Sequence, residues 1–113
     1  MKNIGSILLV VFGISSWAFA KDVLLDVRTP EEYSQEHVPQ ALNVDVKNSN
    51  FKQEIGKLSR EDHYRIYCRT GKRSAQAISI MKEMGFKQME NLGGLEDAKK
   101  VLKVESKTGA VSK

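Results

Sequence analysis

The sequence predicts a small α/β domain with a mainly parallel sheet that is flanked by helices on both faces. Short apolar runs at 23–27 and 63–68 alternate with segments whose apolar residues recur at helical spacing. Polar residues and glycine come directly after these runs, as is typical of the loops at the carboxyl edge of a parallel sheet. The chain has 113 residues and no internal repeat, which is enough for one compact domain and too little for two.

The first half of the expected domain contains two strands and two helices. The continuous apolar run at 23–27 is typical of a buried parallel strand. Thr29, Pro30 and Glu32 then form an N-cap, a first-turn proline and a capping-box glutamate, so a short helix should run to about residue 36. The next expected elements are a strand at 41–44 and a helix with Phe51, Ile55 and Leu58 on its apolar face.

The second half should contain two more strands and two more helices. A strand ends at Cys68, and a helix is expected from Ser74 to about Met84, followed by Gly85 as the C-terminal glycine. A last strand is expected over 87–92, followed by a turn at Gly93-Gly94. The final helix should place four residues inward, namely Leu95, Ala98, Val101 and Leu102.

Cys68 is the only cysteine and stands between the expected strand and the N-terminus of the next helix. Free backbone N–H groups and the positive end of the helix dipole favour a thiolate there. Arg69, Lys72 and Arg73 follow within five residues and act in the same direction. The alternative is that Cys68 is simply a small buried side chain. The glycine and three cations beside it favour a reactive thiolate that faces an anion-binding cradle.

Four segments stand out in order along the chain, namely Asp26-Val27-Arg28 with Glu32-Tyr33, His37-Val38-Pro39-Gln40-Ala41 with Asn43, Cys68-Arg69-Thr70-Gly71-Lys72-Arg73-Ser74, and Asn91-Leu92-Gly93-Gly94-Leu95. Together they resemble the single-domain rhodanese (thiosulfate sulfurtransferase) family, and the cysteine segment resembles its active-site loop. The resemblance covers nearly all of residues 22–100 and implies a rhodanese-like domain. Gln40 departs from the family, which usually has glycine there. If that position has a positive φ, Gln40 carries a modest strain.

The resemblance implies that Cys68 attacks the outer sulfur of thiosulfate, holds that sulfur as a persulfide, and passes it to cyanide or a thiol. Substrate binding is expected from the rest of the loop, which comprises Arg69, Thr70, Gly71, Lys72, Arg73 and Ser74. Because the three cations favour a dianion, thiosulfate should be preferred over mercaptopyruvate. We expect neither a metal nor an organic cofactor.

Four further residues are expected to support the site without reacting. Asp26, Arg28 and Glu32 should form one cluster of ion pairs and hydrogen bonds that holds the loops. His37 precedes Val-Pro and is more typical of a structural hydrogen-bonding group than of a general base. One cysteine and two histidines also make a metal site improbable in this sequence.

Two other functions remain open at this point. A cysteine-dependent phosphatase would have arginine where Ser74 stands, whereas Arg73 comes one residue earlier, so phosphatase activity is disfavoured. A persulfide carrier that delivers sulfur to a partner protein would need the same intact cysteine loop. Thioredoxin-like chemistry is disfavoured because a second, resolving cysteine is missing.

Residues 1–20 have the layout of a secretory signal peptide, with Lys2, an apolar centre at 7–12 and Ala18-Phe19-Ala20 before the cleavage site. The apolar run is too short for a membrane anchor. We expect cleavage after Ala20, a periplasmic location, a domain over 21–103 and a flexible tail over 104–113.

The formal net charge is +4, and loss of Lys2 would leave about +3. Positive and negative residues are interleaved, which favours neither nucleic acid nor, after cleavage, a membrane surface as partner. Nothing in the sequence indicates an oligomer, and we expect a monomer.

Overall fold

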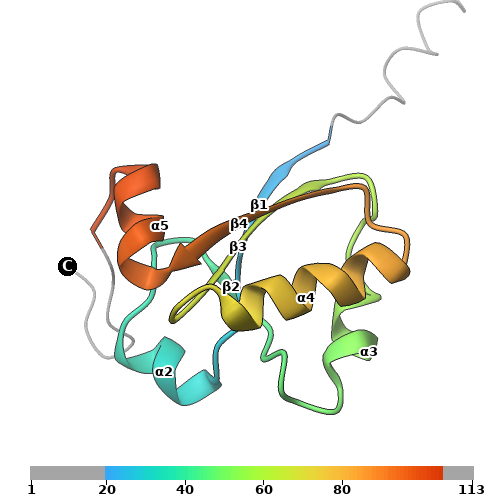
Figure 1. The fold of residues 1–113 in the computed structure, drawn as a ribbon, viewed down its shortest axis with the longest axis horizontal. Helices are drawn as coiled ribbons and strands as arrows, with labels where there is room; N and C mark the ends of the chain where they lie inside the picture. Colours follow the sequence, from blue (N-terminus) through green and yellow to red (C-terminus); the bar gives the residue numbers. More distant parts are fainter. Residues whose placement is uncertain (1–19, 106–113) are drawn as a thin grey trace, which may run out of the picture.

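The computed structural model describes residues 20–105 and contains a four-stranded sheet in which every strand pair is parallel. The strand order is β2-β1-β3-β4 (Figure 1). The elements are β1 (Asp22–Asp26), α2 (Pro30–Gln35), β2 (Leu42–Asn43), α3 (Phe51–Ile55), β3 (His63–Cys68), α4 (Lys72–Glu83), β4 (Gln88–Gly94) and α5 (Leu95–Leu102). The predicted α/β fold is confirmed, and the sheet is parallel throughout.

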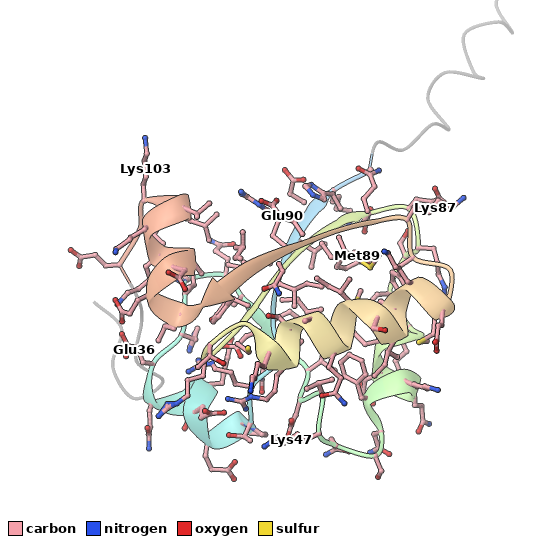
Figure 2. The ribbon with its side chains drawn as sticks, viewed as in Figure 1. Glu36, Lys47, Lys87, Met89, Glu90 and Lys103 are labelled. Carbon is pink, nitrogen blue, oxygen red and sulfur yellow. The ribbon has the colours of Figure 1, made fainter. Side chains whose placement is uncertain are left out.

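Helices cover both faces of the sheet, because alternate residues of each strand point to opposite sides. On one face, Tyr64, Ile66 and Cys68 of β3 pack with residues of α3 and α4. On the other face, Tyr67 packs with α5, and Tyr33 of α2 lies against the same cluster. The alternation continues in β4, where Met89 lies on the α4 side and Glu90 points away from it (Figure 2).

Local sequence signals determine where two of the helices begin or end. The Thr29 hydroxyl accepts a hydrogen bond from Glu32 N at 3.2 Å, and the Glu32 carboxylate accepts one from Thr29 N at 3.0 Å. This is the expected capping box, with Pro30 in the first turn of α2. Gly85 follows α4 with φ +96°, as a C-terminal glycine should. These two predictions are confirmed.

Several element boundaries differ from the sequence-based expectation. Helix α4 begins at Lys72 rather than Ser74, because Gly71 (φ +102°) turns the chain and its carbonyl accepts the first helical bond from Ala75 N at 3.1 Å. Strand β4 continues to Gly94, so the expected turn at Gly93-Gly94 is wrong and α5 starts directly after the strand. Strand β2 is only Leu42–Asn43, and α3 ends at Ile55.

Two residues outside the sheet, Gln40 before β2 and Val101 in α5, also bear on the expectations. The prediction that Val101 faces inward is wrong: its side chain is 51% exposed, and Ala98 is the residue of α5 that is fully buried. Gln40 has φ +73°, so the residue that replaces the family's usual glycine does adopt the left-handed conformation.

The expected signal peptide and most of the expected tail lie outside the described residues, since only Ala20 and residues 104–105 of them are included. Within residues 20–105 we find no helix that is long and apolar enough to cross a membrane.

Candidate active site

Cys68 is the last residue of β3, at the carboxyl edge of the sheet, and its side chain faces the N-terminus of α4. The sequence places it there because the apolar strand ends where Arg69, Thr70 and Gly71 turn the chain into the helix. The residue is 0% exposed and forms no disulfide. The side chain is therefore shielded from solvent.

The Cys68 sulfur accepts hydrogen bonds from the backbone of the loop and the first turn of α4. Gly71 N lies 3.0 Å and Ser74 N 3.4 Å from Sγ, and the Ser74 hydroxyl is 3.6 Å away. Burial by itself raises the pKa of the Cys68 thiol. Hydrogen bonds from the Ser74 hydroxyl and from the amides of Ser74, Gly71 and Thr70 outweigh burial, so the pKa lies below its usual value. The thiolate is thus easier to form at this buried sulfur than at an ordinary cysteine.

Asn91 on β4 links the loop to the neighbouring strand, a role that its sequence context does not indicate. Its Nδ2 donates to Gly71 O at 3.1 Å, while its Oδ1 accepts from Ser74 Oγ at 2.7 Å and from Gly93 N at 2.8 Å. Ser74 has one hydroxyl proton and three acceptors within reach: Asn91 Oδ1, Gly71 O and the Cys68 sulfur. The only sequence signal for Asn91 was its place before the Gly-Gly pair.

A bulge in β4 brings this strand close to the loop. The pairing of β3 with β4 shifts between Ile66 and Tyr67, so that Leu92 has no partner of its own and Gly93 takes φ +90°. The following residue, Gly94, packs directly against the backbone of Arg69, and a Cβ atom there would overlap the Arg69 carbonyl oxygen. Only glycine fits between the strand and the start of the loop.

The three cations of the loop do not lie in equivalent surroundings. Arg73 is 16% exposed and forms a bidentate ion pair with Glu32 of α2, with nitrogen–oxygen distances of 2.8 and 3.0 Å. Arg69 is 67% exposed, and its NH1 lies 3.9 Å from the same carboxylate. Lys72 and Thr70 are exposed at the surface. The structure thus neutralises part of the positive charge that the sequence led us to expect around the sulfur.

The expected cluster of Asp26, Arg28 and Glu32 is divided in two. Asp26 and Arg28 are both buried and share an ion pair of 2.7 Å, and Arg28 also donates to the Glu36 carbonyl at 2.6 Å. Burial by itself lowers the pKa of Arg28. The hydrogen bonds and the ion pair with Asp26 raise this pKa by more than burial lowers it, so the guanidinium stays charged. Glu32 instead binds the loop arginines, as described above.

The Nδ1 of His37 lies 2.7 Å from the Tyr33 carbonyl oxygen, which accepts a hydrogen bond from it. The His37 ring also stacks on the Tyr33 ring, with 3.7 Å between the ring centroids. These contacts agree with a structural role at the end of α2. Within residues 20–105 no group of three or more His, Cys, Asp or Glu side chains is placed to hold a metal ion.

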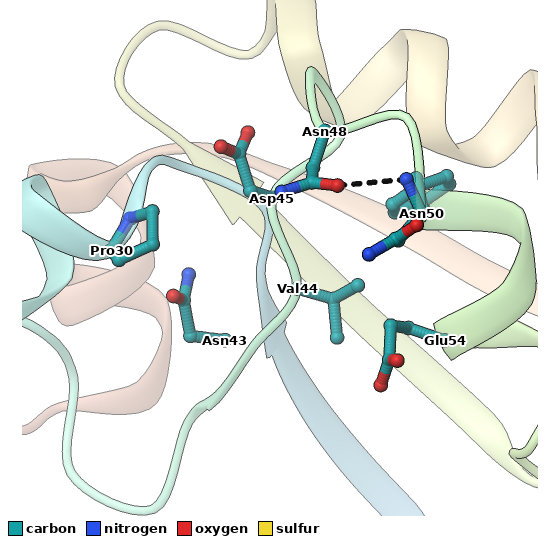
Figure 3. A pocket seen from close by; sticks show the side chains of 8 residues that line it. Pro30, Asn43, Val44, Asp45, Asn48, Asn50 and Glu54 are labelled. Carbon is teal, nitrogen blue, oxygen red and sulfur yellow. Dashed lines mark hydrogen bonds between the residues drawn. The ribbon is translucent and has the colours of Figure 1, made fainter.

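A pocket of about 200 Å³ lies beside β2 and is separate from the sulfur. Its polar lining consists of Asp45, Glu54 and the amides of Asn43, Asn48 and Asn50 (Figure 3). Asn48 Oδ1 and Asn50 N are already joined by a 2.7 Å hydrogen bond. No residue of the loop 68–74 lines this pocket. We place the candidate site at Cys68 and not in the pocket, because Cys68 carries the nucleophilic sulfur and the N–H groups that face it.

We expect Ser74→Ala to raise the pKa of Cys68, because it removes one of the groups that lower it and leaves the backbone donors in place. The rate of thiol alkylation at neutral pH should fall by roughly two- to tenfold, the range for one net hydrogen bond of about 0.5–1.5 kcal/mol. The pH profile of iodoacetamide alkylation measures both quantities.

Ser79→Ala is the matched control for this prediction, because Ser79 lies on the same helix and is exposed. An unchanged pH profile in Ser74→Ala would show that the backbone N–H groups alone set the pKa of Cys68.

Known proteins that are similar to this chain indicate the family to which it belongs. Residues 15–100 match the family model of the rhodanese-like domain. The chain is 40% identical over 79 residues to the thiosulfate sulfurtransferase PspE of Escherichia coli, covering 70% of this chain and 76% of the relative. It is 33% identical to the putative sulfur carrier protein YrkF of Bacillus subtilis, covering 61% of this chain but only 36% of that longer protein.

A solved structure described as a rhodanese with anions from E. coli superimposes with a TM-score of 0.63 at 34% identity. The match covers 78% of this chain and 99% of that one. The fold, the ordered motifs, the cysteine loop and these likenesses agree, and the chain belongs to the rhodanese-like family.

Proposed function

We propose that the protein is a thiosulfate sulfurtransferase that works through a persulfide on Cys68. The observation that carries the proposal is the position of the only cysteine. Its buried sulfur accepts N–H groups at 3.0 and 3.4 Å, and its pKa lies below the usual value. A nucleophilic sulfur in an anion-binding cradle suits a donor that is itself an anion.

The reaction has two steps. The Cys68 thiolate attacks the outer sulfur of thiosulfate, the bond between the two sulfurs of the donor breaks, and sulfite leaves with the bonding electron pair. Cys68 then carries a persulfide anion, whose terminal sulfur has the same charge as the original thiolate and can use the same N–H donors. An acceptor such as cyanide attacks this terminal sulfur, forms thiocyanate, and regenerates the thiolate.

The choice of thiosulfate rests on the donor's charge and on the relatives. PspE is named a thiosulfate sulfurtransferase, and the E. coli rhodanese structure is described with anions. We infer that Arg69 and Lys72, which are exposed beside the loop, attract the dianion and favour it over mercaptopyruvate, which carries a single carboxylate.

The test is mass spectrometry of the purified protein after incubation with thiosulfate, followed by cyanide. We expect one added sulfur atom, its loss on addition of cyanide, and release of thiocyanate over repeated turnovers. Mercaptopyruvate should load the protein more slowly than thiosulfate. Absence of the added sulfur with every sulfane donor would contradict the proposal.

A persulfide carrier is the second candidate, favoured by the likeness to the putative sulfur carrier protein YrkF. A carrier would load one sulfur from thiosulfate but release it slowly to cyanide or small thiols. The same experiment therefore separates turnover from storage. A phosphate monoester, tried in parallel, should not be hydrolysed.

We further propose that the protein is exported to the periplasm as a monomer. Residues 1–20, including the cleavage site after Ala20, have the layout of a signal peptide. The domain over 21–103 would then be released with its tail at 104–113. N-terminal sequencing of the protein from the producing cell should start at Lys21, and an intact Met1 on the functional protein would contradict export.

A further inference from the structure

The carboxylate of Glu32 lies between the two arginines of the cysteine loop. Its Oε1 is 2.8 Å from Arg73 NH1, its Oε2 is 3.0 Å from Arg73 NH2, and Arg69 NH1 approaches Oε2 to 3.9 Å. The Glu32 side chain is 24% exposed, so this ion pair is partly shielded from water. Glu32 comes from α2, 41 residues before Arg73, and faces the loop from another element.

Glu32 is ionised at every pH at which the protein would act. The hydrogen bond from Arg73 is the main cause that lowers the pKa of Glu32 to about 2. The pKa of Arg73 is raised first by Glu32 and also by the charges of Cys68 and Asp45. Arg73 therefore lies within electrostatic reach of both the sulfur and two carboxylates, and a fixed negative charge is held against the loop arginines.

We propose that Glu32 is a specificity-determining residue: its carboxylate competes with anionic sulfur donors for Arg73 and Arg69 and so weakens the site's preference for dianions. This inference rests on the proposed sulfur-transfer function and deepens it. It predicts that the present sequence uses monoanionic donors, such as an alkyl thiosulfonate, better than the three loop cations alone would allow. The alternative is that Glu32 only supports the loop and α2.

Glu32→Gln removes the charge and keeps the contacts that cap α2 and one of the two bonds to Arg73. A glutamine carbonyl can still accept the hydrogen bond that Thr29 N donates to Oε1 at 3.0 Å, as well as one from Arg73. The Thr29 hydroxyl still accepts from the backbone N of residue 32. The contacts that cap α2 are thus retained while the negative charge is lost. The one bond that is also lost is that from Arg73 NH2 to Oε2, because the amide nitrogen of glutamine does not accept a hydrogen bond.

The first measurement is alkylation of Cys68 by iodoacetate and by iodoacetamide, which form a thioether and release iodide. Cys68 is the only thiol, so no other group reacts in the same way. One reagent is an anion and the other is neutral, and the ratio of their rates reports the local field independently of sulfur transfer. We expect Glu32→Gln to raise the iodoacetate-to-iodoacetamide ratio by roughly three- to thirtyfold.

Glu31→Gln is the matched control, because Glu31 is exposed, lies in the same first turn of α2 and changes the net charge equally. This control should leave the ratio within twofold of the wild type. A rise in Glu31→Gln equal to that in Glu32→Gln would show a general charge effect and overturn the inference. An unchanged or lower ratio in a folded Glu32→Gln protein would overturn it as well.

The second measurement is kcat/KM for thiosulfate and for a monoanionic alkyl thiosulfonate. We expect Glu32→Gln to favour the dianion over the monoanion by at least threefold and to steepen the salt dependence of thiosulfate use. An equal loss for both donors would mean that Glu32 only supports the loop. If the wild type transfers sulfur from neither donor, the proposed function fails, and the alkylation ratio still tests the inference.

The alkylation ratio of Glu32→Asp is a further test, and it does not depend on whether Glu32→Gln folds. Aspartate keeps the charge but shortens the side chain by one methylene. Because the charge is what matters in our inference, Glu32→Asp should stay within twofold of the wild-type alkylation ratio. A change of threefold or more in this charge-conserving variant would overturn the inference.

Discussion

Cys68→Ser is expected to abolish sulfur transfer, with a loss of at least about a thousandfold in kcat/KM for thiosulfate. A serine hydroxyl remains protonated under conditions in which the lowered pKa of Cys68 makes thiolate available. It also cannot form a persulfide. Thiocyanate release measures the rate, and mass spectrometry should show an added sulfur atom on the wild type and none on the variant.

The fold should survive this substitution. Cys68 is buried between the sheet and α4, and serine has nearly the same volume. Ser74 Oγ and two backbone amides surround the sulfur and can bond a hydroxyl instead. We therefore expect a thermal unfolding midpoint close to that of the wild type. A folded Cys68→Ser protein that still released thiocyanate would show that the sulfur does not pass through Cys68.

Gly94→Ala is expected to have the second largest effect, because Gly94 pairs with Cys68 across the two strands and packs against the start of the loop. Its φ of −91° suits alanine, so the backbone conformation is not the obstacle. The obstacle is the Arg69 carbonyl oxygen, which a Cβ atom would overlap. The carbonyl belongs to the main chain, so relief requires the strand β4 and the start of the loop to separate.

This separation should displace the residue that follows Cys68 and weaken the cradle. We expect Gly94→Ala to lower stability by about 1–3 kcal/mol or more, as for other overpacked sites. We expect kcat/KM for thiosulfate to fall by at least about tenfold. Chemical denaturation and the thiocyanate assay measure the two effects.

Gly56→Ala is the control for this prediction. Gly56 follows α3 with φ −60°, a conformation that alanine adopts freely, and its added Cβ would meet Lys52 O at 3.1 Å. We expect at most a small change in stability and unchanged kinetics in this variant. Wild-type stability and rates in Gly94→Ala would mean that the loop tolerates the displacement.

Several features of the site could be predicted from the sequence because they depend on neighbours in the chain. The apolar run before Cys68 gives a buried strand, and Gly71 allows the turn that brings Gly71 N and Ser74 N to the sulfur. The capping box of Thr29 and Glu32 likewise needs residues only three positions apart. The fold class and the nucleophile were therefore accessible from local patterns and motif order.

The surroundings of the nucleophile depend on residues that are far apart in the chain. Glu32 meets Arg73 across 41 positions, and Asn91 reaches Gly71 and Ser74 across 20 and 17 positions. The three cations in the loop sequence predict a strongly basic site. The packing of α2 against the loop brings in Glu32, which neutralises part of that positive charge. Which side chains meet across so many positions of the chain depends on how whole helices and strands are placed against one another.

By itself, the sequence determined that a single cysteine ends a buried strand before a helix, because apolar periodicity, glycine and capping residues act over a few positions. Only the tertiary structure decided which groups face that cysteine. The parallel pairing of β3 with β4, with its bulge at Leu92, brings Asn91 and Gly94 to the loop, and α2 brings Glu32. The reason is physical: strand register and helix packing emerge from the burial of both faces of the sheet, which no local segment encodes.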